Sequence, residues 1–290
     1  MSDKILITGA TGNIARILIP GLQAAGVSIR GFVRNPEKAQ GLKDAGVEVV
    51  EGEFANSESL DTAMNGVGSV LLITAPNPDA VVQTSNVLAA AKRAGSPRIV
   101  RISVLGAAED APTDNGRLHF KTEQEIQDSG LSYVIIRPHF FMQNLFMSAE
   151  SIGSDGAMYW GMDEGRLGMV DVRDIADVAL KILTESGHEG KTYTLTGPAA
   201  ISFRDVAKTI SSAIGKEVNY VAVPLEAVTE SILKMGMGDW FAKVMTDYSR
   251  AYSEGWGDFT TEDVQSVTGN PPRSVETFVS EVLAPALSSQ

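Results

Sequence analysis

The chain has 290 residues, with 24 Lys and Arg against 36 Asp and Glu, so its formal net charge is −12 and its sequence pI is near 4.8. Sequence-independent binding of nucleic acid is excluded, because so acidic a chain lacks the clustered cations that neutralise phosphates. It has no cysteine and three histidines, which excludes disulfides and thiolate catalysis and makes a metal site unexpected. No apolar run approaches the roughly 20 residues that cross a bilayer, and no signal segment is visible, so we expect a cytoplasmic protein that does not bind membranes.

Short apolar runs alternate with helical patterns through the first half of the chain. The runs that predict strands are near-continuously apolar, as expected of strands buried on both faces, and cover residues 4–8, 28–33, 48–51, 69–74, 99–103 and 133–136. Patterns with a 3.6-residue period lie between them, the first containing Pro20, at which we expect a kink and not a break. Gly26, Gly46 and Gly130 stand where left-handed helix caps belong. The predicted fold class is α/β, a Rossmann-type doubly wound parallel sheet.

The pattern changes after residue 144. A helical face lies within residues 203–214, a strand is expected at 218–223, two helices within 227–256, and a last helix after Pro271-Pro272. Residues 168–172 and 191–195 can extend the sheet. We therefore predict a dinucleotide-binding core over residues 1–144 and a smaller, mostly helical substrate-binding part over 145–290, of which segments near 168–195 return to the sheet.

The most specific motif directly follows the first strand and directly precedes a helix. There, Gly9 permits a tight turn, Gly12 lets the backbone approach a pyrophosphate, and Ala15 lets the helix lie close to the strand. The N-terminus of the helix then presents unpaired N–H groups to the phosphates. At the first strand–helix junction of a βαβ pattern, this spacing predicts a dinucleotide site formed by Gly9, Ala10, Thr11, Gly12, Asn13 and Ile14.

The end of the second strand indicates which dinucleotide is bound. A site for NAD places a carboxylate there, whereas a 2′-phosphate requires a cation. Here the strand ends in Arg34, whose guanidinium can bind a phosphate bidentately, so the sequence favours NADPH over NADH. Cations within residues 36–43 are an alternative to Arg34. Phe54, after the third strand, is a candidate contact for the adenine.

Several further segments carry a resemblance to a known family. They are residues 8–12, 33–36, 129–133, 137–138, 170–176, 192–198 and 268–272, spread over nearly the whole chain. Together they resemble the NmrA-like, atypical branch of the short-chain dehydrogenases/reductases. That branch includes NADPH-dependent quinone reductases, triphenylmethane dye reductases, tailoring reductases of natural products, and proteins that bind the cofactor only to sense redox state.

The resemblance implies further contacts with the cofactor. The resemblance implies that residues after the fourth strand border the ribose, namely Thr74, Ala75 and Pro76. It implies that Ser103 and Val104, after the fifth strand, lie under the nicotinamide. It also implies that Pro138, His139 and Phe140, after the sixth strand, close over the nicotinamide. The positions agree with the rule that such sheets bind ligands beyond the carboxyl ends of their strands.

The proton donor of the larger superfamily, a Tyr with a Lys four residues later, is absent, because none of the six tyrosines has that partner. In the equivalent helix, His119 and Glu123 share one face, whereas Lys121 points about 200° away from His119. His119 is the candidate acid and Lys121 the alternative, beside the simpler interpretation that His119 and Glu123 only pack near the cofactor.

Without the Tyr–Lys pair as proton donor, an unactivated ketone is a poor substrate. An electron-poor acceptor needs mainly to be held close to the nicotinamide. The sequence therefore predicts flavin-free hydride transfer from NADPH to a quinone-like or polycyclic aromatic acceptor. The candidate pocket residues are Phe141, Gln143 and Trp160. The rivals are an NADP(H) sensor without turnover and a tailoring oxidoreductase or oxygenase for a polyketide-type ring. The oligomeric state stays open, with a homodimer among the alternatives.

Overall fold

A computed structural model describes residues 4–288 and divides them into two compact units. Unit 1 comprises residues 4–110, 116–137 and 175–193, and unit 2 comprises 111–115, 138–174 and 194–288. The chain therefore crosses between the units several times, and a helix and a strand from its second half return to unit 1.

Unit 1 is built on a seven-stranded sheet whose strand order is β3-β2-β1-β4-β5-β6-β9. The paired strands from β3 to β6 run parallel. The strands are β1 (Lys4–Thr8), β2 (Ser28–Val33), β3 (Glu48–Glu51), β4 (Ser69–Leu72), β5 (Arg98–Ile102), β6 (Tyr133–Pro138) and β9 (Thr192–Leu195). This confirms the predicted Rossmann-type fold class, and most strand limits agree within two residues.

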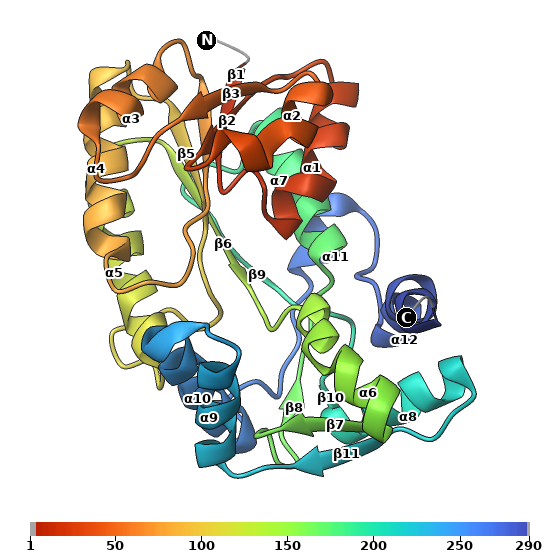
Figure 1. The fold of residues 1–290 in the computed structure, drawn as a ribbon. Coiled ribbons are helices and arrows are strands. Elements are labelled where there is room, and N and C mark those ends of the chain that lie inside the picture. The colour runs from red at the N-terminus through yellow and green to blue at the C-terminus, as the bar shows by residue number, and fades with distance from the viewer. Residues whose placement is uncertain (1–3, 289–290) are drawn as a thin grey trace. The chain divides into compact units, whose positions relative to one another are not determined.

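Helices cover both faces of this sheet (Figure 1). On one face lie α1 (Asn13–Ala24), the short pair η1 (Pro36–Ala39) and α2 (Gln40–Asp44), and α7 (Val172–Thr184). On the other lie α3 (Ser57–Met64), α4 (Ala80–Arg93) and α5 (Asp114–Asp128), over a core that includes Leu6, Val70, Leu88, Ile99 and Ile126. Helix α1 continues through Pro20, as predicted.

Glycines end several of these helices in the predicted way. Gly26 and Gly46 adopt φ angles of +76° and +77°. After α1, the amide of Gly26 donates to the carbonyl of Gln23 and that of Val27 to Leu22, which closes the helix end. Glycine adopts the left-handed conformation at little energetic cost, so the chain can turn here directly into the next strand.

Unit 2 contains two small sheets and a set of helices. The parallel pair is β7 (Ala157–Trp160) with β11 (Asn219–Ala222), and the antiparallel pair is β8 (Arg166–Leu167) with β10 (Ile201–Ser202). Its helices are η2 (Met142–Ser148), α6 (Ala149–Asp155), α8 (Phe203–Ile214), α9 (Leu225–Lys234), α10 (Gly238–Ser253), α11 (Asp263–Thr268), α12 (Val275–Phe278), η3 (Val279–Leu283) and α13 (Ala284–Ser288). The two predicted helices within residues 227–256 are α9 and α10, which pack against each other.

One predicted extension of the sheet is wrong. Residues 191–195 do form the edge strand β9, but residues 168–172 do not join the seven-stranded sheet. Val170 forms only an isolated bridge with Phe141. The carboxylate of Asp171 accepts the amide of Arg173 at 2.9 Å, so this apolar run ends in the first turn of α7 and not in a strand.

Candidate functional site

The glycine-rich segment after β1 forms a tight turn. Gly9 adopts a φ of +62°, and the amide of Gly12 donates to the carbonyl of Gly9 at 2.9 Å. A Cβ atom at Gly9 would lie 3.3 Å from the Cβ of Ile73, and one at Gly12 would lie 3.1 Å from the carbonyl oxygen of Gly9. A side chain at either position would therefore force its neighbours to shift by a few tenths of an ångström.

Helix α1 begins at this turn without a capping side chain. Gly12 is its N-cap, and its first turn contains no acidic residue. The amide of Arg16 makes the first helical hydrogen bond, to the carbonyl of Gly12 at 3.1 Å. The preceding N–H groups and the positive end of the helix dipole therefore form an anion site at an exposed turn.

The turn lies where the strand order of the sheet reverses. From β1 the chain builds the sheet outward through β2 and β3, and then from β4 in the other direction. The hydroxyl of Thr8, at the end of β1, accepts the amide of Ile73 and donates to its carbonyl, each at 2.7 Å. This pins the loop after β4 to the end of β1, and its residues Thr74, Ala75 and Pro76 follow directly. Such a switch point is where doubly wound sheets bind ligands.

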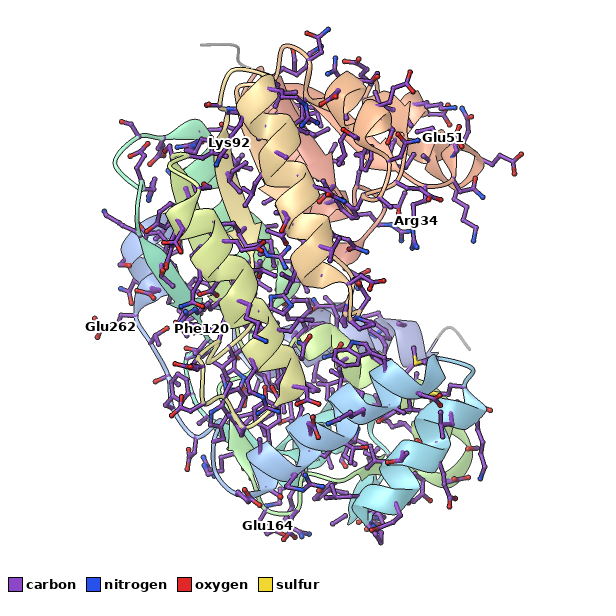
Figure 2. The ribbon with its side chains drawn as sticks, turned by 90° about the vertical axis from the view of Figure 1, so that its left-hand side faces the viewer. Arg34, Glu51, Lys92, Phe120, Glu164 and Glu262 are labelled. Carbon is purple, nitrogen blue, oxygen red and sulfur yellow. The ribbon has the colours of Figure 1, made fainter. Side chains whose placement is uncertain are left out.

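Arg34 follows β2 at the same edge of unit 1 and is exposed (Figure 2). No residue within 4–288 forms an ion pair or hydrogen bond with its guanidinium. The next residue, Asn35, holds the turn, because its side-chain oxygen accepts the amide of Glu37 at 2.9 Å. Phe54 is half-buried against Phe32, with ring centroids 5.7 Å apart. A free cation and an aromatic side chain thus fit the phosphate and adenine ends of a dinucleotide.

A buried polar cluster lies at the carboxyl ends of β5 and β6 in unit 1. Arg101, on β5, is fully buried, and its Nη2 donates to the hydroxyl of Thr74 at 2.9 Å. The same Nη2 lies 3.4 Å from Nδ1 of His119. The hydroxyl of Ser103 lies 3.3 Å from that Nδ1 and donates to the carboxylate of Glu123.

Glu123 connects this cluster to β6. Its carboxylate is buried and accepts two hydrogen bonds from the guanidinium of Arg137, one of them at 3.0 Å from Nε. Arg137 is thus paired with this buried carboxylate, whose negative charge also acts through space on the buried guanidinium of Arg101. A buried charge needs such a partner, since burying it unpaired costs several kcal/mol.

His119 is neutral at physiological pH. Burial first, and the nearby positive charge of Arg101 second, hold the pKa of its imidazole well below the ordinary 6.5. Burial also lowers the pKa of Arg101 to about 10, which still leaves that guanidinium charged at pH 7. The expected role of His119 as an imidazolium acid is therefore disfavoured, because the charged form is scarcely populated.

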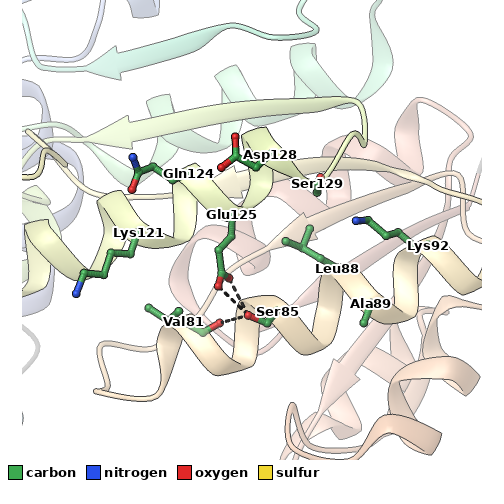
Figure 3. Close-up of a pocket in the computed structure, with 10 residues that line it drawn as sticks. All are labelled: Val81, Ser85, Leu88, Ala89, Lys92, Lys121, Gln124, Glu125, Asp128 and Ser129. Atoms are coloured by element: carbon green, nitrogen blue, oxygen red, sulfur yellow. Dashed lines mark hydrogen bonds between the residues drawn. The ribbon is translucent and has the colours of Figure 1, made fainter.

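Lys121 lies apart from this cluster. It is exposed and lines a surface pocket of about 670 Å³ between α4 and α5, together with Ser85 and Glu125, which hydrogen-bond to each other (Figure 3). His119 is buried on a different face of the same helix, so the two do not act on one reactant.

The residues predicted to close over the nicotinamide are buried within unit 2. Nδ1 of His139 accepts the amide of Phe140 at 2.7 Å, and Nε2 lies 3.1 Å from the carbonyl of Gly257, to which it donates. Burial lowers the pKa of His139 to about 4. Phe140 packs edge-on against Trp160 and Phe203, and Pro138 is buried as well. Neither ring nitrogen of His139 is left for a cofactor.

The predicted substrate residues also lie in unit 2. The amide of Gln143 donates to the carboxylate of Asp171 at 2.9 Å and accepts the backbone amide of Val172 at 3.0 Å. The indole of Trp160 is buried and donates to the hydroxyl of Ser148 at 2.8 Å. These two side chains are thus occupied by the packing of unit 2, whereas Phe141 is half-buried.

Sequence reasoning missed Arg101 and the pairing of Arg137. A signal was present, because both cations lie in mostly apolar strands, and a charge in a buried strand requires a partner. Within residues 4–288 no group of three or more His, Asp or Glu can hold a metal ion. None of the helices in that range is long and apolar enough to span a membrane.

A glycine turn and an uncapped helix at the switch point of a doubly wound sheet define a dinucleotide-binding protein of the Rossmann type. Within that class, the chain belongs to the NmrA-like family, whose model matches residues 1–267.

Among its relatives is an NAD(P)H azoreductase from Xenophilus azovorans, which is 36% identical over 94% of this chain and 96% of the relative. The structure of the NADPH-dependent quinone oxidoreductase QOR2 from Escherichia coli, complexed with NADPH, is similar with a TM-score of 0.85 at 28% identity, covering 98% of this chain and 99% of the other. The structure of the triphenylmethane reductase of Citrobacter sp., complexed with NADP(H), is similar with a TM-score of 0.85 at 30% identity, covering 95% of this chain and 98% of the other.

Proposed function

We propose that the protein is an NADPH-dependent oxidoreductase that passes a hydride, without a flavin, to a quinone-like or polycyclic aromatic acceptor. The observation that carries the proposal is the uncapped N-terminus of α1 behind the Gly9–Gly12 turn, with the unpaired guanidinium of Arg34 after β2. The first suits a pyrophosphate and the second a 2′-phosphate. Relatives named for NAD(P)H or NADPH support the same assignment.

The acceptor class is proposed from two considerations. The relatives are named for azo, quinone and triphenylmethane reduction, and such acceptors take a hydride without a strong acid beside them. In this chain the usual Tyr–Lys donor is absent, and His119 is neutral. The bound nicotinamide supplies the hydride, and the protein holds the two reactants together, which by itself is worth several kcal/mol of the barrier.

Of the residues predicted from the sequence, we propose Gly9, Ala10, Thr11, Gly12, Asn13 and Ile14 for the pyrophosphate, Arg34 for the 2′-phosphate, Phe54 for the adenine, and Thr74, Ala75, Pro76, Ser103 and Val104 for the ribose and nicotinamide. Phe141 is the proposed aromatic contact for the acceptor. We propose no catalytic role for Lys121 and no direct contact for His139, Gln143 or Trp160, because their positions and partners give them other roles.

The test is NADPH consumption by the purified protein, shown first to carry no flavin absorbance. The acceptors are a benzoquinone, a naphthoquinone, an azo dye, a triphenylmethane dye and, as a negative control, a simple ketone, each with and without oxygen and with NADH in place of NADPH. We expect turnover with at least one quinone or dye, a preference for NADPH, no reaction with the ketone, and no need for oxygen.

Two outcomes would contradict the proposal. Tight NADPH binding without turnover of any acceptor would favour a redox sensor. Incorporation of oxygen into the product under air would favour an oxygenase of ring systems.

A further inference from the structure

The contact with Arg101 determines which nitrogen of His119 carries hydrogen. The guanidinium of Arg101 has only donors, and its Nη2 lies 3.4 Å from Nδ1 of His119. If Nδ1 carried a hydrogen, two donors would face each other there. The hydroxyl of Ser103, also near Nδ1, gives its hydrogen to Glu123 and could therefore only accept from Nδ1, but the charged guanidinium of Arg101 is the stronger of the two partners. Nδ1 is therefore the acceptor, and in a neutral imidazole the hydrogen is then on Nε2.

That Nε2–H group has no partner. No residue within 4–288 accepts a hydrogen bond from it, although 96% of the surface of His119 is removed from solvent, leaving 4%. Among residues 4–288, Nε2 of His119 is not one of the polar atoms that are sealed from solvent without a partner, so its hydrogen is accessible to a ligand. The free donor is therefore available to a ligand that carries a hydrogen-bond acceptor.

Arg101 itself is fixed from two sides. Its guanidinium donates to the hydroxyl of Thr74 at 2.9 Å and contacts the carbonyl of Leu72 at 3.4 Å. Since Leu72 ends β4 and pairs with Arg101 in the sheet, this cation ties the loop after β4 to β5. The same group thus sets the orientation of His119 and the position of the loop that we assign to the ribose.

We propose that Arg101 is a positioning residue: it donates to Nδ1 of His119, so that His119 offers its Nε2–H, as a neutral hydrogen-bond donor, to the anion that forms on the acceptor. This inference rests on the proposed function. In the step that it serves, a C–H bond of the dihydronicotinamide breaks, and its electron pair and hydrogen pass to the acceptor. The nicotinamide becomes the cation and the acceptor the anion, which takes its proton from water after the step.

The charged groups around His119 favour this neutral state. Arg101 on β5 faces it directly, Glu123 on α5 is held by Arg137 on β6, and Ser103 lies between them. The carboxylate would stabilise an imidazolium, but it is ion-paired with Arg137, and the cation of Arg101 is in contact with the ring. A neutral donor stabilises a developing anion without giving up a proton, which suits an acceptor that forms a stable anion.

The first test is ¹⁵N NMR of the imidazoles, which distinguishes the two tautomers and the imidazolium in the unliganded protein. The three histidines are assigned with His188→Gln and His119→Gln. We expect His119 to carry its hydrogen on Nε2 and not to titrate between about pH 5.5 and 8. In Arg101→Met, which removes the charge and keeps the side-chain volume, we expect His119 to titrate in that range or to populate both tautomers.

Two internal controls accompany this measurement. Arg98→Met removes an arginine from the same strand that pairs instead with Glu189 and the carbonyl of Leu183, and it should leave His119 unchanged. The signals of His139, whose ring nitrogens are held by Phe140 and Gly257, should not change in either variant. A wild-type His119 that titrates near its ordinary pKa, that carries its hydrogen on Nδ1, or that is unaffected by Arg101→Met would overturn the inference.

The second test uses turnover of the acceptor found in the NADPH assay. His119→Leu, which removes the donor, should lower kcat about 10-fold to 100-fold. His119→Gln restores a neutral N–H group near the Nε2 position and should recover much of that loss, without a change in the dissociation constant of NADPH. If Gln and Leu were equally impaired, His119 would not act as a neutral donor.

The two tests separate this inference from the proposed function. If no acceptor is turned over, the function fails, while the NMR result still decides whether Arg101 fixes the tautomer. If turnover is found but His119 behaves as an ordinary titrating imidazole, the positioning role of Arg101 fails and the oxidoreductase assignment stands.

Discussion

His119 in unit 1 and His139 in unit 2 are both buried, and burial lowers the pKa of both, yet their ring nitrogens are used differently. Both nitrogens of His139 bind backbone groups of unit 2. His119 uses only Nδ1, and its other nitrogen has no partner within residues 4–288. The comparison teaches that burial and a shifted pKa do not distinguish the two histidines, whereas the hydrogen-bond partners of their ring nitrogens do.

The same contrast holds for the other predicted site residues. In unit 1 the N-terminus of α1 and the side chain of Arg34 are exposed and unused. In unit 2 the polar atoms of Gln143 and Trp160 are occupied by Asp171, Val172 and Ser148. Substitutions in unit 1 should therefore change ligand binding, and substitutions at these positions of unit 2 should change stability.

The largest effect is expected from Glu123→Gln, which removes the charge that pairs with Arg137 and acts through space on Arg101. Arg137 would lose its buried ion-pair partner and Arg101 a nearby opposite charge, so the free energy of unfolding should fall by about 3 kcal/mol. Urea denaturation at neutral pH measures it. Glu125→Gln, two residues along the same helix, removes a charge that accepts a hydrogen bond from the hydroxyl of Ser85 and should cost less than about 0.5 kcal/mol. Similar losses in both variants would refute the proposed importance of the buried cluster.

Acid should destabilise the protein through both buried histidines. The pKa of His139 is about 4 in the folded chain, against 6.5 for an ordinary histidine, so the unfolded chain binds more protons between these pH values. Stability is therefore retained above pH 6.5 and falls as the pH drops toward 4, by about 3 kcal/mol from His139, with His119 acting in the same direction.

The measurement is urea denaturation over this pH range. His139→Gln, which cannot titrate, should reduce the slope of unfolding free energy against pH, whereas the same change at His188, which is partly exposed, should reduce it much less. A wild-type slope that stays unchanged in His139→Gln would contradict the assignment.

Gly9→Ala should weaken NADPH binding about 10-fold to 100-fold, because alanine disfavours the φ of +62° and its Cβ would crowd Ile73. Isothermal titration measures the affinity. Gly26→Ala is the matched control, since Gly26 adopts a similar φ of +76° with open space around it. It should lower stability by about 1 kcal/mol and leave NADPH affinity unchanged. If both variants lost affinity equally, the turn would not be the phosphate site.

Arg34→Ala should weaken NADPH about 10-fold and leave NADH nearly unchanged, because one charge-assisted pair with the 2′-phosphate is lost. Lys43→Ala removes an equal charge from the neighbouring helix α2 and should have a smaller effect. Equal losses for NADPH and NADH in Arg34→Ala would remove the assignment of Arg34, and a larger loss in Lys43→Ala would move it to that helix.

The fold followed from local patterns. Buried parallel strands are apolar throughout, so the runs at β1, β2 and β3 were visible with their limits, and the Gly9–Gly12 turn marked the first strand–helix junction. The prediction of a strand at residues 168–172 was wrong because an apolar run of that length fits a strand and the start of a helix equally well. Only the contact of Asp171 with Arg173 decides between the two.

By itself, then, the sequence determined the class of fold, the family to which the chain belongs, and the position of the dinucleotide turn, because these depend on periodicity and on glycine spacing within a few residues. Only the tertiary structure decided which candidate side chains are free. Arg101, His119, Glu123 and Arg137 come from three separate elements, and the state of His119 depends on which of them contacts its ring. Hydrogen-bond partners and desolvation are set by groups distant in the chain, so local patterns do not determine them.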